Sequence, residues 1–358
     1  MHDLASIPVK AVFLHSGHLP PIFWGMKNIT KITLTVISTL FLTFFILLFV
    51  IAHYTLVFVL DTQSDGVIFP AEMNSKDPAT GQQAVHREWM LLASSHQQLL
   101  SEDGLELNAY YIPAPKPSDL YVILCHGYRN SALSMAEYAY VYHRAGWNVL
   151  VLDHRSHGYS EGRFITMGWK EHEDLIMWIQ QLVEHDSQAQ VLLHGVSMGA
   201  VTVMMACGSP SLPENVVAAV EDCGYTSVRD EFLDKIAPVM GFTAQPFLSF
   251  ASLLNRIQSG YFLEEVNCVE AVSQSEIPIL FIHGRRDDFV PFWMLEELYG
   301  AATCPKIKLV VPEAAHAQAR LVNPQLYWST VEFFVDRFFS PNKEKISSSA
   351  NLVRFESN

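Results

Sequence analysis

The chain has 358 residues, 50% of them hydrophobic, and 37 acidic residues outnumber 23 basic ones to give a formal net charge of −14. This length allows one large α/β domain with an N-terminal extension. The acidic balance argues against a nucleic-acid-binding surface, which would be basic, and the five cysteines lack the paired spacing of a disulfide framework.

An uninterrupted apolar run occupies residues 32–60 and contains no Asp, Glu, Lys or Arg. About 20 apolar residues are enough to cross the hydrocarbon core of a bilayer. The sequence therefore predicts a transmembrane anchor at 32–60, after an N-terminal extension at 1–31 and before a linker at 61–84. The alternatives are a buried helix and a cleavable signal peptide, but the run is apolar on all sides, is long for a signal peptide and precedes no clear A-x-A site.

The charges on either side of this run predict its orientation. Lys27 and Lys31 precede the run, whereas Asp61 and Asp65 follow it. Because basic residues are retained on the cytoplasmic side of a membrane, we expect a single-pass membrane protein with an extracellular C-terminal domain.

Beyond the linker, short apolar runs alternate with helical patterns. Residues 88–92 and 97–112 predict early antiparallel strands, with a tight hairpin turn at Asp103-Gly104. Further strands are expected at 119–125, 147–152, 190–194, 216–222, 277–283 and 307–312, and helices at 133–145 and 169–186. Strands that alternate with helices predict a mostly parallel sheet with right-handed crossovers.

The loop after the strand at 119–125 begins His126-Gly127-Tyr128. Gly127 permits a turn that directs the backbone N–H of Tyr128 toward negative charge developing on a substrate carbonyl oxygen. The alternative is that Tyr128 is an ordinary loop aromatic.

The sequence Gly195-Val196-Ser197-Met198-Gly199 lies between an apolar strand and a small-residue helix at 200–207. G-x-S-x-G in a strand–turn–helix context is a nucleophile elbow. The sharp turn exposes the serine hydroxyl, and the flanking glycines let strand and helix pass closely. The N–H of Met198, at the start of the helix, is expected to complete an oxyanion hole with the N–H of Tyr128.

An acid and a histidine follow at the ends of the next two strands. Asp287 lies just beyond the strand at 277–283, and His316 follows the run at 307–312. The order Ser, Asp, His is the order of a triad built on such an elbow. We therefore expect Ser197 to be the nucleophile, His316 the general base and Asp287 the group that orients His316, with Asp288 as the alternative acid.

Residues 226–276 separate the strand at 216–222 from the strand at 277–283 and are rich in large apolar residues. Their pattern predicts a helical cap that lines a pocket for an acyl or aryl group. Tyr225 and Tyr261 are candidate pocket residues, and the alternative is that the aromatic residues of the cap only pack on the domain.

Together these motifs resemble the α/β-hydrolase superfamily over roughly residues 85–340. They are most similar to bacterial membrane-anchored or secreted esterase-like proteins, related to serine aminopeptidases and monoacylglycerol lipases. The motifs that carry the resemblance are His126-Gly127, 153–162, the elbow, 284–287 and Ala315-His316. One departure is Ser156, which stands where the family loop often has glycine before His157. The resemblance implies an α/β-hydrolase fold with a mostly parallel central sheet flanked by helices and a small helical cap.

The combined expectation is a membrane-tethered serine hydrolase that cleaves carboxylic esters through an acyl-enzyme. A peptidase or thioesterase would use the same triad, and a non-catalytic binding protein is the alternative of another class. The fifteen histidines show no H-E-x-x-H or similar spacing, so no metal or other cofactor is expected. The expected partners are a small-molecule acyl substrate and the membrane, and the polar tail at 341–358 is expected to be disordered.

Overall fold

The computed structural model describes residues 21–63 and 81–339. Residues 1–20, most of the predicted linker at 61–84 and the predicted disordered tail lie outside the described residues. The chain divides into two compact units, Met1–Ile51 and Ala52–Asn358. The boundary falls within the long helix α1 (Pro21–Leu60), so the last two turns of α1 belong to the second unit.

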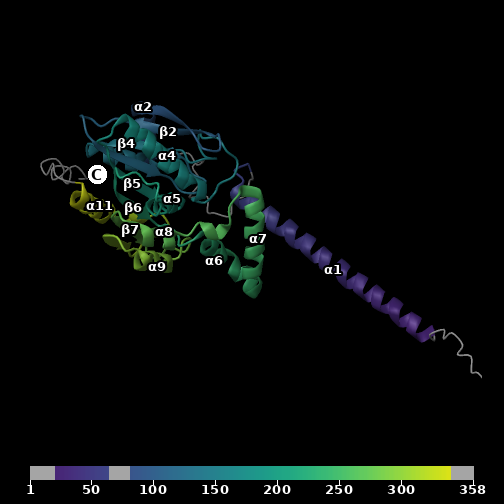
Figure 1. Cartoon of the computed structure of the whole chain (residues 1–358). Helices are drawn as coiled ribbons and strands as arrows, with labels where there is room; N and C mark the ends of the chain where they lie inside the picture. Colours follow the sequence, from purple (N-terminus) through teal and green to yellow (C-terminus); the bar gives the residue numbers. More distant parts are fainter. Residues whose placement is uncertain (1–20, 64–80, 340–358) are drawn as a thin grey trace, which may run out of the picture. The chain divides into compact units, whose positions relative to one another are not determined.

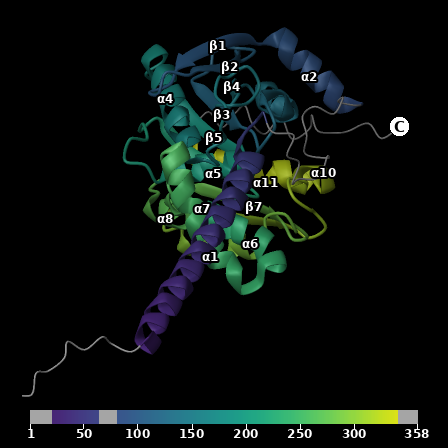
Figure 2. The same cartoon turned by 90° about the vertical axis from the view of Figure 1, so that its right-hand side faces the viewer.

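The second unit is built on an eight-stranded sheet with the order β1-β2-β4-β3-β5-β6-β7-β8, whose first strands can be followed in Figure 2. The pairs β1–β2 and β2–β4 are antiparallel, and the pairs from β4 to β8 are parallel, which confirms the predicted sheet. The strands are β1 (Ser95–Leu100), β2 (Glu106–Ile112), β3 (Leu120–Cys125), β4 (Asn148–Leu152), β5 (Gln190–Val196), β6 (Val216–Asp222), β7 (Ile279–Gly284) and β8 (Lys306–Val311).

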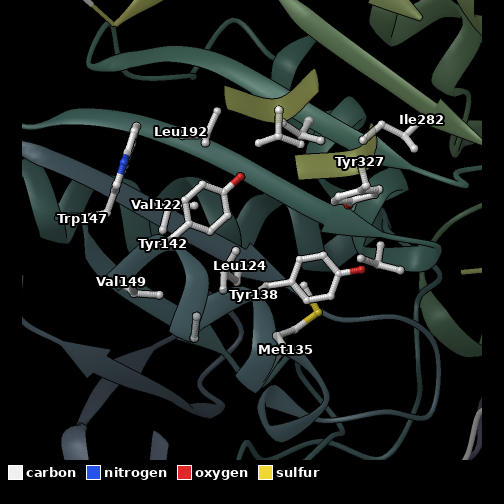
Figure 3. Close-up of a cluster of buried hydrophobic side chains, with 14 of the residues drawn as sticks. Val122, Leu124, Met135, Tyr138, Tyr142, Trp147, Val149, Leu192, Ile282 and Tyr327 are labelled. Carbon is white, nitrogen blue, oxygen red and sulfur yellow. The ribbon is translucent and has the colours of Figure 1, made fainter. Parts of the chain in front are cut away.

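Helices cover both faces of this sheet. One face carries α2 (Gln82–Ala93), α3 (Ala136–Arg144) and α11 (Pro324–Phe338), which enclose an aromatic core between themselves and alternate residues of the strands. Figure 3 shows Tyr138, Tyr142 and Tyr327 of this core beside Val122 and Leu124 of β3. Further helices are α4 (Trp169–His185), α5 (Met198–Cys207), α8 (Cys268–Gln274), α9 (Trp293–Ala301) and α10 (Ala319–Val322). Of these, α5 packs against β5, α4 and α8.

The prediction of a strand at 88–92 is wrong, because these residues lie in α2. Met90 is fully buried in the aromatic core, whereas Leu91 and Leu92 are exposed. A short apolar run does not distinguish a helix from a strand without knowledge of the surface against which it packs.

The predicted cap is helical. It consists of α6 (Val228–Met240) and α7 (Ala244–Ser259), joined by the short 3-10 helix Gly241–Thr243 and followed by α8. Among the described residues, Val228–Ser259 and Ile29–Leu60 are long and apolar enough to cross a membrane. Phe247, Leu248 and Ala251 of α7 are buried within the second unit, as expected of a cap helix.

The topology determines where the site forms. The carboxyl ends of β3, β5, β7 and β8 lie at one edge of the sheet, since Cys125 pairs with Gly195 and Gly284 pairs with Val311 in parallel register. Loops that follow these strands therefore converge, as is typical of sites in open α/β sheets.

Candidate active site

Ser197 occupies a strained turn between β5 and α5. Its φ of 57° and ψ of −120° lie outside the regions that L-residues favour. A Cβ at Gly195 would overlap the backbone of Gly199, and a Cβ at Gly199 would overlap the carbonyl of Cys125. Both glycines are therefore required for the close passage of strand and helix that holds the serine in this conformation.

Ser197, His316 and Asp287 form a continuous hydrogen-bonded chain. The Nε2 of His316 lies 2.9 Å from the Oγ of Ser197, and its Nδ1 lies 2.8 Å from the Oδ2 of Asp287. A carboxylate only accepts hydrogen bonds, so Nδ1 carries the proton and Nε2 is left to accept the hydroxyl proton of Ser197. The side chain of Asp287 is fully buried, whereas Asp288 is exposed to solvent.

The loop after β7 fixes the carboxylate of Asp287. The backbone N–H groups of Phe289 and Val290 donate to its Oδ1 at 3.0 and 2.8 Å. His283 lies on its other side, with Nε2 3.4 Å from Oδ2 of Asp287 and 2.9 Å from the carbonyl of Val290. Burial lowers the pKa of His283, so this ring is neutral and donates from Nε2 to the carbonyl.

The loop after β3 lies directly against the serine. A Cβ on Gly127 would stand 3.3 Å from the Cβ of Ser197, an approach that favours glycine at this position. Tyr128 and Met198 line the same pocket as Ser197, as expected of two residues that would supply oxyanion donors. The phenol of Tyr128 donates to the carbonyl of Val59.

The pocket beside Ser197 is mostly apolar. The space between its lining atoms, open solvent at its mouth included, is about 770 Å³. Its walls come from the end of α1, the start of α5, the cap, and the loops that contain Tyr128, Met167, Tyr225 and Phe289. The cap residues are Phe232, Ile236, Phe247, Leu248 and Ala251, together with Glu231 and Lys235.

Comparison with known proteins identifies the fold to which this chain is similar. Residues 116–265 match the family of serine aminopeptidases, S33. The uncharacterized protein YqkD of Bacillus subtilis is 29% identical over 234 residues, which cover 65% of this chain and 76% of YqkD. An esterase of Pyrococcus furiosus, Pf2001, superposes with a TM-score of 0.57 at 23% identity, covering 76% of this chain and all of the esterase. The chain has the α/β-hydrolase fold.

A second solved structure shares this fold. The acylaminoacyl peptidase of Pyrococcus horikoshii superposes with a TM-score of 0.52 at 17% identity, over 70% of this chain and 42% of the peptidase. The esterase and the peptidase both resemble this chain at the level of the fold.

Buried histidines support the loops of the hydrolase. His126 bonds the carbonyl of Gly127 through Nδ1 at 2.7 Å and accepts from the N–H of His154 through Nε2 at 3.1 Å. His157 accepts from the N–H of Arg129 at 3.1 Å. Burial lowers the pKa of His126 to about 4 and that of His157 to about 3, so both rings are neutral at physiological pH. Their role is to hold the loops through hydrogen bonds.

The structure shows how the loop accommodates Ser156, which stands where the family often has glycine. Its φ is 65°, in the left-handed region where glycine is the usual residue. The serine hydroxyl donates to the carbonyl of Phe164 at 2.9 Å, and its N–H donates to Glu161 at 2.8 Å. Neighbouring Arg155 is buried and paired with Asp174 at 2.7 Å, so the loop is held on both sides of the serine.

Not every sequence-based expectation about the pocket is met. Tyr225 lines the pocket and its hydroxyl donates to the carbonyl of Met167 at 3.0 Å. Tyr261, by contrast, is fully buried and stacks on Trp169 outside the pocket lining.

Sequence reasoning missed two groups of pocket residues. Thr55, Leu56 and Val59 come from the run assigned wholly to a membrane anchor, so no local signal identified them. Glu231 lies in the cap, and burial raises its pKa to about 8. Most of this carboxyl group is therefore protonated at neutral pH, which leaves the pocket with little negative charge.

Among the described residues, one group could offer three ligand atoms to a metal ion. Cys223, Asp287 and His316 have such atoms within 4.8 Å of one another. Asp287 and His316 are already hydrogen-bonded to each other. Burial raises the pKa of the Cys223 thiol, which disfavours the thiolate form that binds metals. All five cysteines are free thiols.

Replacing Gly199 with alanine should destabilise the hydrolase strongly, because the new methyl group would overlap the carbonyl of Cys125. We expect a loss of at least about 3 kcal/mol in the free energy of unfolding, measured by urea titration. Gly300 of α9 is the control: its Cβ would meet nothing within 4 Å, so Gly300→Ala should be neutral or slightly stabilising. Equal behaviour of the two variants would contradict this account of the elbow.

Proposed function

We propose that this α/β-hydrolase cleaves carboxylic esters through a Ser197–His316–Asp287 triad and an acyl-enzyme. The observation that carries the proposal is the pair of hydrogen bonds at His316: Nε2 accepts from Oγ of Ser197 at 2.9 Å, and Nδ1 donates to Oδ2 of Asp287 at 2.8 Å. The mostly apolar pocket beside Ser197 favours an acyl group as the part of the substrate that is bound.

In this mechanism, Oγ of Ser197 attacks the ester carbonyl while Nε2 of His316 accepts the hydroxyl proton. The N–H groups of Tyr128 and Met198 stabilise the oxyanion, and Asp287 stabilises the imidazolium. His316 then protonates the leaving alcohol as the C–O bond breaks. Water, deprotonated by the same histidine, hydrolyses the acyl-enzyme and restores Ser197.

We further propose that the apolar segment from Ile29 to Leu60 contains an uncleaved membrane anchor, with the hydrolase unit outside the cell. Its length and composition support the span, and the positions of Lys27 and Lys31 before it support the orientation. Labelling of a cysteine introduced near residue 350 by a membrane-impermeant reagent in intact cells tests this topology, and protection from the reagent would contradict it.

The chemistry is tested on the full chain with a fluorophosphonate probe and a matched panel of p-nitrophenyl esters, thioesters and aminoacyl amides. We expect covalent labelling and fastest turnover of the oxygen esters. Cleavage of amides alone would replace the esterase with a peptidase, in keeping with the family match to serine aminopeptidases. A folded chain that does not react with the probe would favour a non-catalytic binding protein.

A further inference from the structure

The end of helix α1 is part of the hydrolase unit. Ala52, Leu56, Val59 and Leu60 are each at most 6% exposed. Together with Thr55 they follow the spacing of one helical stripe, which faces the interior of the second unit. The end of the apolar segment is therefore packed as core rather than as a tether.

Polar contacts fix this end of α1 to the loops of the site. The carbonyl of Val59 accepts the phenol proton of Tyr128, whose backbone N–H is a proposed oxyanion donor. Arg129 donates to the carbonyls of Phe58 and Asp61 at 3.2 and 2.9 Å. The carboxylate of Asp61 pairs with Arg163 at 2.7 Å, so the helix end cannot shift without moving these loops.

The same helix end forms a wall of the acyl pocket. Thr55, Leu56 and Val59 line it together with Ser197 and the apolar residues of the cap. An acyl chain attached to Ser197 and occupying this pocket would therefore contact α1.

The proposed membrane-spanning segment directly precedes this wall in the chain. Large apolar side chains from Ile29 to Ile51 are exposed, which makes them the candidates for lipid contact. These 23 residues span about 34 Å of helix at 1.5 Å per residue, enough for a hydrocarbon core of about 30 Å. Thr55 follows Ile51 by only four residues of the same helix, so this part of the pocket wall comes directly after the proposed membrane span in the chain.

The cap also carries exposed apolar side chains. Val239 is 88% exposed, Phe242 94% and Ile257 77%. Aromatic and aliphatic side chains with such exposure are suited to the interfacial region of a bilayer.

We propose that the substrate is a membrane-resident ester with a long acyl chain, which enters the pocket from the lipid–water interface and packs against Thr55, Leu56 and Val59. This inference rests on the proposed serine hydrolase function and specifies its substrate class. It also requires that α1 be retained, because loss of residues 52–61 would remove the wall and the bonds to Tyr128 and Arg129.

The first test introduces a larger side chain at Leu56, in the part of the pocket wall that α1 supplies. The full chain in phosphatidylcholine vesicles is assayed with p-nitrophenyl dodecanoate and p-nitrophenyl acetate, as the parent, as Leu56→Trp and as Tyr54→Trp. Tyr54 is 67% exposed and lies outside the pocket lining, so it controls for the introduced indole. Leu56→Trp should lower the ratio of kcat/KM for dodecanoate to that for acetate at least about ten-fold, and Tyr54→Trp should keep the parent ratio. An unchanged ratio in a probe-reactive Leu56→Trp chain overturns the inference.

The second test needs no variant. A hexadecyl fluorophosphonate with a diazirine near the end of its tail is reacted with the parent chain in vesicles, irradiated, and mapped by mass spectrometry. We expect tail adducts on residues 52–60 and on the facing cap residues. Adducts confined to other segments overturn the inference, whereas absence of reaction at Ser197 overturns the proposed function itself.

A third measurement addresses the route of entry. A fluorogenic long-chain ester is placed either in the vesicles that hold the hydrolase or in separate vesicles of the same composition. Faster turnover in the shared bilayer is expected, and equal rates for both arrangements overturn entry from the bilayer.

Discussion

Ser197→Ala is expected to abolish ester turnover and labelling by the fluorophosphonate probe while leaving the fold intact. The Oγ of Ser197 is the atom bonded to His316 and is proposed to form the acyl-enzyme. Removal of a triad nucleophile typically lowers kcat by at least about 10³-fold. The measurements are the initial rate with p-nitrophenyl butyrate, the stoichiometry of labelling and the melting temperature.

Ser209, which follows the other end of α5, provides a matched control because it lies outside the pocket. Ser209→Ala should retain the parent rate and labelling. Residual labelling of a folded Ser197→Ala chain would show that another nucleophile reacts with the probe.

The convergence of Ser197, Asp287 and His316 could be predicted because each follows its own strand closely. Parallel strands fix the edge at which their loops meet, so strand order and loop position carry most of the information. The choice between Asp287 and Asp288 was a matter of loop register. In the structure, two backbone N–H groups hold Asp287 against His316, while Asp288 is in solvent.

Other features depend on packing that no local pattern encodes. The strand expected at 88–92 is a helix because α3 offers a surface on which Met90 can be buried. The run at 32–60 is uniformly apolar in sequence, yet its last turns form a pocket wall through contacts with Tyr128 and Arg129, nearly 70 residues away. His283 likewise supports Asp287 only through the fold of the loop after β7.

Asp287→Asn is expected to lower kcat by about 10⁴-fold, with little change in stability, because it reverses the tautomer of His316. The N–H groups of Phe289 and Val290 donate to Oδ1 and will hold the amide oxygen of the asparagine on their side. The amide nitrogen then faces Nδ1 of His316 and donates to it. The imidazole must carry its proton on Nε2, where it can no longer accept the proton of Ser197.

Asp288→Asn is the matched control, with the same chemical change at the adjacent, exposed position. It should alter kcat/KM for p-nitrophenyl butyrate by less than about two-fold, as expected of a surface charge that touches no reacting group. Because the two variants have the same net charge, any difference between them reports the position of the carboxylate. If Asp288→Asn were the inactive variant, the hydrogen-bonded chain from Ser197 to Asp287 would not be the catalytic one.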